Sequence, residues 1–214
     1  MARRQTTLIL TRDARGPIAP LEAPAGIRVV YVVRPGDEGF AELDSLCRSY
    51  DFPASWVADM LATGAEAFAA IPVDPSPSLR AVAAGWLTRK PFYVDEIGYT
   101  FTPVPEGDYY FGDFVEPAWR GRKLQRLLIH RRLEASAAAG RLWAFSMMRR
   151  DNPASLRSYQ AEQFQPAARL RTMRVAGLGL DRLVPLHPDF PHGWLFTPGW
   201  DMPFSLRLRG RNRG

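Results

Sequence analysis

The sequence predicts an α/β fold: helices flanking a mixed, mainly antiparallel sheet within a single domain. Three observations support this prediction. Apolar residues alternate between the two-residue spacing of strands and the longer spacing of helices along the chain. No Pro/Gly/Ser-rich linker separates two hydrophobic halves. A chain of 214 residues with 46% hydrophobic and 23% charged residues is long and apolar enough for one sizeable core.

The first quarter of the chain predicts an arm, a strand and two helices. Residues 1–25 contain three prolines and little periodicity, so we expect a loosely attached arm. The β-branched run at 27–33 predicts a strand. Apolar residues at helical spacing predict one helix over 40–50 and a second over 57–68.

The middle of the chain predicts a loop followed by three strands. Residues 71–78, "IPVDPSPS", have the composition of a loop. The segments 79–87, 91–101 and 108–116 are rich in β-branched and aromatic residues and are separated by short turns. We expect these three strands to be successive antiparallel neighbours.

The second half continues with alternating helices and strands. In order, we expect a helix ending near Gly140, a strand at 141–148, a helix at 151–164 and a strand at 168–175. In the second of these helices, Asn152 suits the N-cap and Pro153 the first helical position. The domain thus spans 26–180. An aromatic and basic arm at 181–214 would pack over the sheet or against a partner subunit, which leaves a homodimer open.

Composition narrows the partners. Residues 1–107 hold 10 Lys/Arg and 13 Asp/Glu, whereas residues 108–214 hold 18 and 9, so an anionic partner would meet the second half. One cysteine, Cys47, and three scattered histidines offer no ligand set for a metal. No apolar run suits a signal peptide or a membrane span, so we expect a cytoplasmic protein without a membrane partner.

Positive charge is concentrated where a helix begins. Arg120, Arg122, Lys123 and Arg126 surround the predicted start of the helix that ends near Gly140. Cations at a helix N-terminus oppose the helix dipole, and the backbone N–H groups there lack helical partners. The arrangement is favourable if an anion binds there, because amides, dipole and side chains then all attract it.

The segment "FVEPAWRGRKLQRLL" resembles the strand–loop–helix signature V-x-P-x-x-R-G-x-G-x-G/A of the GNAT superfamily of acyl-CoA-dependent N-acyltransferases. The order of the predicted elements is also similar. The resemblance implies that the N–H groups of residues 122–126 bind the pyrophosphate of coenzyme A. Gly121 matches the signature, whereas Lys123 and Gln125 replace its later small residues.

A second segment, "DNPASLRSYQAEQF", is similar to the superfamily's N-x-x-S/A-x-x-x-Y-x-x-x-G-F pattern, with Gln163 in place of the glycine. The resemblance implies that Tyr159 protonates the departing thiolate and that Asn152 holds either the pantetheine arm or the helix start. Together the two segments cover residues 109–164. The residues expected to bind the cofactor are Phe114, Val115, Arg120, Gly121, Arg122, Lys123, Leu124, Gln125, Arg126, Asn152, Ser155 and Tyr159.

A general base for the acceptor amine is the least defined part of the site. Strand alternation places Phe111, Asp113 and Val115 on one face, and acids on this strand often act as base in GNAT-like enzymes, so Asp113 is the first candidate. Glu96 on the preceding strand is the second. Two alternatives stay open: Asp113 pairs with a neighbouring arginine, or the enzyme selects the free amine from solution.

The function implied by the resemblance is transfer of an acetyl or other short acyl group from acyl-CoA, as co-substrate, to a primary amine. The transfer would be direct, in a ternary complex and without a metal. The acceptor is a small-molecule, sugar or peptide amine. Two other hypotheses remain: a catalytically degenerate CoA-binding module, because Lys123 and Gln163 replace glycines, and a basic nucleic-acid-binding protein. Nucleic acid is not the expected partner, because no nucleic-acid-binding motif accompanies the charge.

Overall fold

The computed structural model describes residues 3–74, 80–94, 97, 99–175, 178–186 and 205–208. The strands of the main sheet are β1 (Arg3–Asp13), β2 (Ile27–Val32), β3 (Glu66–Pro72), β4 (Ala83–Thr88), β7 (Gly107–Val115), β8 (Trp143–Arg149), β9 (Gln165–Val175), β10 (Leu178–Pro185) and β11 (Ser205–Leu208). A separate hairpin comprises β5 (Phe92–Val94) and β6 (Tyr99–Phe101). The helices are α1 (Phe40–Arg48), α2 (Trp56–Ala62), α3 (Leu124–Ala138) and α4 (Pro153–Ala161), with a 3₁₀ turn η1 (Pro117–Trp119) before α3.

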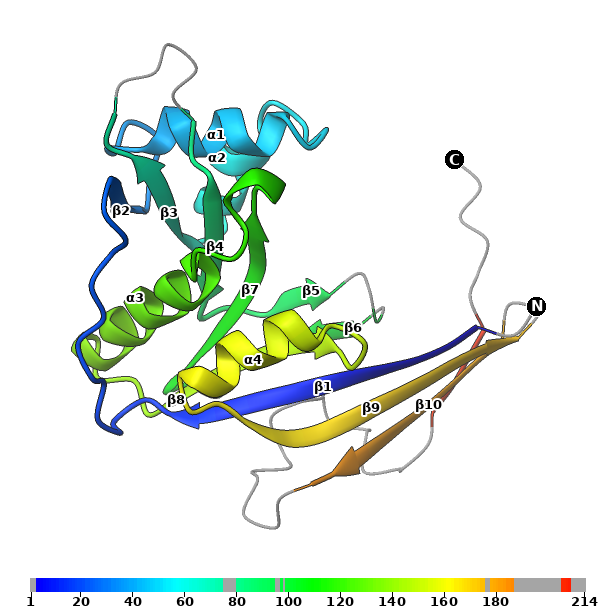
Figure 1. The fold of residues 1–214 in the computed structure, drawn as a ribbon. Helices are drawn as coiled ribbons and strands as arrows, with labels where there is room; N and C mark the ends of the chain where they lie inside the picture. Colours follow the sequence, from blue (N-terminus) through cyan, green and yellow to red (C-terminus); the bar gives the residue numbers. More distant parts are fainter. Residues whose placement is uncertain are drawn as a thin grey trace.

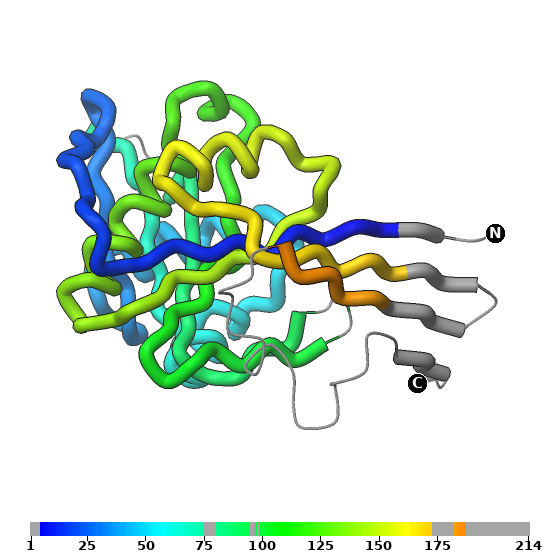
Figure 2. Tube along the Cα trace, turned by 90° about the horizontal axis from the view of Figure 1, so that it is seen from below, coloured from blue at the N-terminus to red at the C-terminus, as the bar shows by residue number. Residues whose placement is uncertain are grey.

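The main sheet has the strand order β11-β10-β9-β1-β8-β7-β4-β3-β2 over the described residues. Its pairs are antiparallel except for β7 and β8, which are parallel. This confirms the predicted α/β class with a mixed, mainly antiparallel sheet. Figures 1 and 2 show that β1, β9 and β10 lie side by side and project beyond the body of the domain.

The sheet is covered on both faces. Helices α3 and α4 lie on one face, where Leu128 and Tyr159 pack into a core that includes Leu8 and Phe164. Helices α1 and α2 cover the other face through Leu43, Leu61 and similar residues that pack against Trp86. Within the described residues, no helix combines the length and the apolar character needed to cross a membrane.

Strands β7 and β8 pair only over their first halves. The parallel register runs from Gly107 opposite Trp143 to Tyr110 opposite Ser146 and then ends, although both strands continue. The two strands therefore diverge and leave an opening in the sheet at their C-terminal ends. In Figure 1, β7 rises away from β1, the strand that pairs with the whole of β8. Where parallel strands separate in this way, the facing backbone N–H and C=O groups lose their partners in the sheet and can hydrogen-bond to a ligand.

A β-bulge reverses part of the predicted strand alternation. Ala84 pairs with Phe114 and Trp86 with Phe111, so Gly112 and Asp113 together face the single Gly85. Gly112 has a φ of 61°, as expected for a bulge that requires a left-handed residue. The extra residue turns Asp113 toward α3 and α4, whereas Phe111 packs on the opposite face. The expectation that Phe111 and Asp113 share a face is therefore wrong.

The N-terminal segment is part of the sheet. Residues 3–13 form β1 between β8 and β9, so the expectation of a loosely attached arm over 1–25 is wrong for these residues. Leu8, Ile9 and Leu10 are all buried, because this strand is covered on both faces. A short continuous apolar run is the signature of such a strand.

Three other expectations were wrong. The second helix stops before Gly64, whose φ is 87°, and Phe68 lies in β3, not in that helix. The segment 91–101 is the β5–β6 hairpin, and β4 pairs directly with β7. At the C-terminal end β10 and β11 extend the sheet into the predicted arm at 181–214, whereas residues 187–204 and 209–214 of that arm lie outside the described residues.

Candidate active site

A cleft of about 790 Å³ lies between the C-terminal half of β7, the start of α3 and the exposed side of α4. It is lined by Asp113, Phe114, Val115, Trp119, Arg120, Gly121, Lys123, Leu124, Gln125, Arg126, Asn152, Ala154, Ser155, Arg157, Ser158 and Ala161. The cleft thus joins the two sequence segments that carry the resemblance. It extends from the basic turn before α3 to Asp113 at the opening between β7 and β8.

The N-terminus of α3 is open toward this cleft. Lys123 is the N-cap residue, with a φ of 61°, and no side chain caps the helix. The N–H groups of the first turn therefore have no side-chain acceptor, and the positive end of the helix dipole faces the same space. Lys123 thus adopts the left-handed conformation that the glycine of the signature would take.

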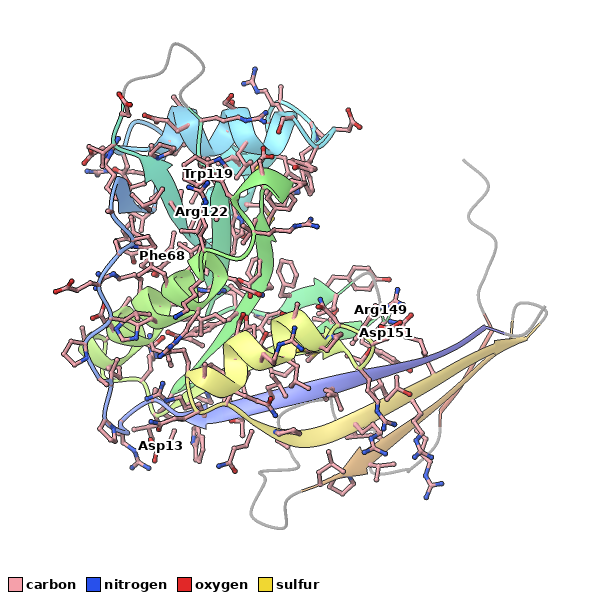
Figure 3. The ribbon with its side chains drawn as sticks, viewed as in Figure 1. Asp13, Phe68, Trp119, Arg122, Arg149 and Asp151 are labelled. Atoms are coloured by element: carbon pink, nitrogen blue, oxygen red, sulfur yellow. The ribbon has the colours of Figure 1, made fainter. Side chains whose placement is uncertain are left out.

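Basic side chains surround the turn with different degrees of freedom. Arg126 already has a partner, because its Nε donates a hydrogen bond to Glu162 Oε1 at 2.7 Å within an ion pair. Arg122 does not line the cleft; its guanidinium lies over the Trp119 ring at 4.4 Å, and Figure 3 labels the two residues beside each other. Lys123 and Arg157 line the cleft, are exposed and form no ion pair with any described carboxylate. Arg157 was not predicted.

Asp113 is the centre of a polar network at the inner end of the cleft. Its carboxylate forms an ion pair with the fully buried Arg132, accepts a hydrogen bond from the Tyr159 hydroxyl at 2.7 Å and accepts another from Gln125 Nε2 at 3.3 Å. The structure therefore realises the alternative in which Asp113 pairs with an arginine. Donors from α3 and α4 thus engage both oxygens of the carboxylate.

Two neighbours fit this network closely. A Cβ on Gly85 would lie 2.8 Å from Asp113 Oδ1 and 2.9 Å from Arg132 Cζ, so the ion pair fills the space that a side chain would need. Arg132 also donates to the carbonyl oxygen of Trp86 at 2.9 Å, and its guanidinium lies 4.9 Å from the centre of the Tyr110 ring. The fully buried Arg132 charge thus has partners, as a buried charge requires.

Burial sets the protonation behaviour of Tyr159 and Arg132. Burial, followed by the charge of Asp113, raises the pKa of the Tyr159 hydroxyl well above its usual value. For Arg132, burial alone would lower the pKa, but the negative charge of Asp113 outweighs it and the pKa is raised. Tyr159 thus keeps its proton and Arg132 its charge at physiological pH.

Helix α4 is anchored to the same network. Asn152 is the N-cap and its side-chain oxygen accepts from the Ser155 N–H at 3.2 Å, so of its two expected roles it performs the helix start. The Ser155 hydroxyl accepts from Gln125 Nε2 at 2.8 Å. Gln125 therefore bridges β7, through Asp113, and α4. Gln163, just after α4, has a φ of 63°, so the second replaced glycine also lies at a left-handed position.

Most of the predicted binding residues are thus brought together. Ten of the twelve line the cleft; Arg122 and Tyr159 do not, and Tyr159 lies just behind Asp113 with 1% of its surface exposed. Glu96 falls outside the described residues. Sequence reasoning missed Arg132, whose only signal was a charge four residues after Leu128 on the apolar side of a helix. Among the described residues, no group of three His, Cys, Asp or Glu side chains is placed to hold a metal ion.

The same architecture occurs in solved structures. A GCN5-related N-acetyltransferase from Sphaerobacter thermophilus matches with a TM-score of 0.59 and 14% identity, over 81% of this chain and 52% of that one. A tandem GNAT protein from the clavulanic acid biosynthesis pathway matches with a TM-score of 0.58 and 14% identity, over 79% of this chain and 53% of that one. A GCN5-related glucosamine N-acetyltransferase region in a fungal multi-domain β-N-acetylglucosaminidase matches with a TM-score of 0.55 and 13% identity, over 79% of this chain and 21% of that one.

This likeness confirms the GNAT fold that the two segments suggested. The chain spans about half the length of the first two of these proteins. No known protein-family profile matches the sequence, and no curated protein sequence is similar to it.

Proposed function

We propose that this chain, which has the GNAT fold, transfers an acetyl or other short acyl group from acyl-CoA to a primary amine. The observation that carries the proposal is a continuous cleft that connects the uncapped N-terminus of α3 to Asp113 at the opening between β7 and β8. A long, phosphorylated thioester needs both ends of such a site: an anion-binding turn and a sheltered place for the reacting carbonyl.

The residues present fit the phosphate end of coenzyme A. The first-turn N–H groups of α3 are not capped by a side chain, and exposed Lys123 and Arg157 supply positive charge from the two sides of the cleft. Backbone amides, a helix dipole and mobile cations together favour a pyrophosphate. Asn152 contributes by capping α4. The pantetheine arm would instead contact the cleft walls, which are formed by α4 and by Phe114 and Val115.

The chemistry supplied by the co-substrate is an activated acyl carbon with a thiolate leaving group. Tyr159 is proposed to hydrogen-bond that thiolate. Its hydroxyl lies 2.7 Å from the cleft-lining Asp113, and its raised pKa means that it stabilises the sulfur as a donor without giving up its proton completely. To do so it must leave Asp113 Oδ2. Gln125, 3.3 Å from the same oxygen, can keep that carboxylate satisfied.

Asp113 is proposed to act in positioning Tyr159 rather than as a free base. Both of its carboxylate oxygens already accept hydrogen bonds, Oδ1 from Arg132 and Oδ2 from Tyr159 and Gln125. The amine is then expected to be taken from solution in its neutral form. Direct attack in a ternary complex follows, because buried Cys47, whose pKa is raised to about 12 by burial, is unsuited to carry an acyl intermediate.

The test is release of coenzyme A thiol from acetyl-CoA in the presence of a panel of primary amines, followed by mass spectrometry of the acceptor. We expect amine-dependent release and an acetylated product. Saturable acetyl-CoA binding without product from any amine would instead favour the catalytically degenerate module. Absence of binding would remove the proposal altogether, and a gel shift on DNA and RNA would then test the nucleic-acid hypothesis.

A further inference from the structure

On the face of the sheet opposite the cleft, the opening between β7 and β8 is bordered by apolar side chains. Phe111 of β7 and Met147 of β8 are partly buried against the cluster on that face. Phe111 and Met147 directly follow the last β7–β8 pair, so they are the first residues at the opening. The bulge at Gly112 places Asp113 on the other face, toward the cleft.

A continuous series of rings leads from this opening to the surface. The Phe111 ring stacks on Trp86 with centres 6.4 Å apart, and Trp56 meets Trp86 edge-on at 5.3 Å. Phe52, 42% exposed, follows Trp56 at 4.4 Å. On the other side, Phe92 of the β5–β6 hairpin lies 4.1 Å from Phe111. Elements α2, β4, β5 and β7 therefore each contribute a ring.

The two carboxylates at the C-terminal end of β7 are engaged by other residues, so they are not free to bind an acceptor on this face. Asp113 is held by Arg132, Tyr159 and Gln125, and Glu116 is buried, pairs with Arg80 and accepts from Tyr50. A polar acceptor rich in hydroxyls or charges would leave its own groups unsatisfied against this wall. An aromatic group gains both from the area it buries and from ring-to-ring contact.

We propose that the acceptor is a primary amine carried by an aromatic ring, such as an arylalkylamine. This rests on the proposed function, in which acyl-CoA fills the cleft on the α3–α4 face, so that the amine must come from the opposite face. The ring lies along Phe52, Trp56 and Phe111, and the amino group enters the opening. The N–C bond to the acyl carbon forms, the C–S bond breaks with its electron pair on sulfur, and one amine proton ends on the thiol.

The first test compares thiol release from acetyl-CoA with 2-phenylethylamine, butylamine, spermidine and glucosamine at equal concentrations of free amine. We expect kcat/KM for 2-phenylethylamine to exceed each of the others at least tenfold. A comparable or higher value for any of the other three overturns the inference but leaves the proposed acyl transfer intact. If no amine releases thiol, the acyl transfer itself fails. Quenching of tryptophan fluorescence then decides on the ring site: a preference for 2-phenylethylamine over butylamine supports it, and no preference overturns it.

The second test changes the wall. Phe52→Ala, at a half-exposed position, should raise KM for 2-phenylethylamine at least fivefold, with KM for butylamine and Kd for acetyl-CoA within twofold. Trp56→Ala should do the same more strongly, and its melting temperature shows whether it is folded. Tyr31→Ala is the matched control, because Tyr31 is a 48% exposed aromatic residue that contacts Phe68 in the core on the α3–α4 face. An unchanged KM for 2-phenylethylamine in folded Phe52→Ala would contradict the proposal.

Discussion

The Tyr159 hydroxyl donates a hydrogen bond to Asp113 Oδ2 at 2.7 Å and thereby joins α4 to β7 where β7 separates from β8. Tyr159 comes from the second segment that carries the resemblance, and Asp113 directly precedes the first. Their contact lies at the inner end of the cleft, behind the position proposed for the thioester. Because Arg132 holds the same carboxylate, the tyrosine, the aspartate and the arginine form one unit.

Tyr159→Phe tests the proposed role of the hydroxyl. We expect turnover to fall about ten- to a thousand-fold, the range for removal of a positioned donor, while Kd for acetyl-CoA stays within a few-fold. Turnover should change more than affinity because Tyr159 does not line the cleft and is proposed to contribute to the reaction more than to binding. Steady-state kinetics with calorimetric binding measures both. Unchanged turnover would reduce Tyr159 to a packed aromatic residue.

Asp113→Asn should be strongly destabilising, because it leaves the Arg132 charge buried without a counter-ion. We expect a loss of about 3–5 kcal/mol in the free energy of unfolding, measured by urea denaturation. Asp13→Asn is the control: the Asp13–Arg15 pair, at 2.7 Å, is exposed to solvent, so its loss should change the free energy of unfolding very little.

Gly85→Ala provides a second approach to the same pair, since its Cβ would crowd both members without changing any charge. We expect a loss of about 1–3 kcal/mol. Equal stability of Asp113→Asn and Asp13→Asn would show that the Asp113–Arg132 ion pair does not hold in solution.

Gln163→Gly should stabilise the chain, although glycine is usually unfavourable. A non-glycine residue in the left-handed conformation costs about 1–2 kcal/mol, and the greater freedom of glycine in the unfolded chain offsets about 0.5–1 kcal/mol of that. Gln160→Gly, on the exposed side of α4, should instead lose about 1 kcal/mol. Chemical denaturation of both variants compares them directly. Equal losses in the two would contradict the left-handed conformation of Gln163.

Stability should fall as the pH rises above about 10. Below that pH both folded and unfolded Tyr159 are protonated, so its contribution is fully present. Above it the unfolded chain releases a proton that the folded chain retains, because burial and Asp113 raise the pKa of folded Tyr159. One retained proton gives a slope of about −1.4 kcal/mol per pH unit.

Tyr159→Phe should make that slope shallower by about this amount, whereas Tyr93→Phe, at an exposed position on β5, should not change it. Unfolding free energies measured between pH 9 and pH 11 supply the comparison. Identical slopes in wild type and Tyr159→Phe would contradict the buried, proton-retaining environment of Tyr159.

Much of the fold could be predicted from local patterns. The Asn152-Pro153 start of α4 and the stop of α3 before Gly140 depend on capping chemistry within a few residues, and both predictions are confirmed. Strand β1 was missed because Leu8, Ile9 and Leu10 lack the alternation of a half-exposed strand; only its partners β8 and β9 explain their burial.

The site could be predicted less completely, because its chemistry depends on contacts between distant segments. The basic turn and Tyr159 were visible in the sequence. The bulge that turns Asp113 toward Arg132 was not, since it follows from pairing with Gly85 on another strand. Arg132 appeared as one charge among several on a basic helix, and only the packed structure shows that it is fully buried.

The most direct test of the central claim is calorimetric titration of acetyl-CoA into the wild-type chain and Lys123→Ala at low and moderate salt. We predict one saturable site whose affinity falls with added salt, because phosphate contacts with exposed cations are screened. Lys123→Ala should bind about tenfold more weakly or worse, with a flatter salt dependence, since a charge-assisted hydrogen bond contributes about 1.5–3 kcal/mol. Absence of binding at millimolar acetyl-CoA would contradict the account. Tighter binding by Lys123→Ala would make the lysine an obstruction and favour the degenerate module.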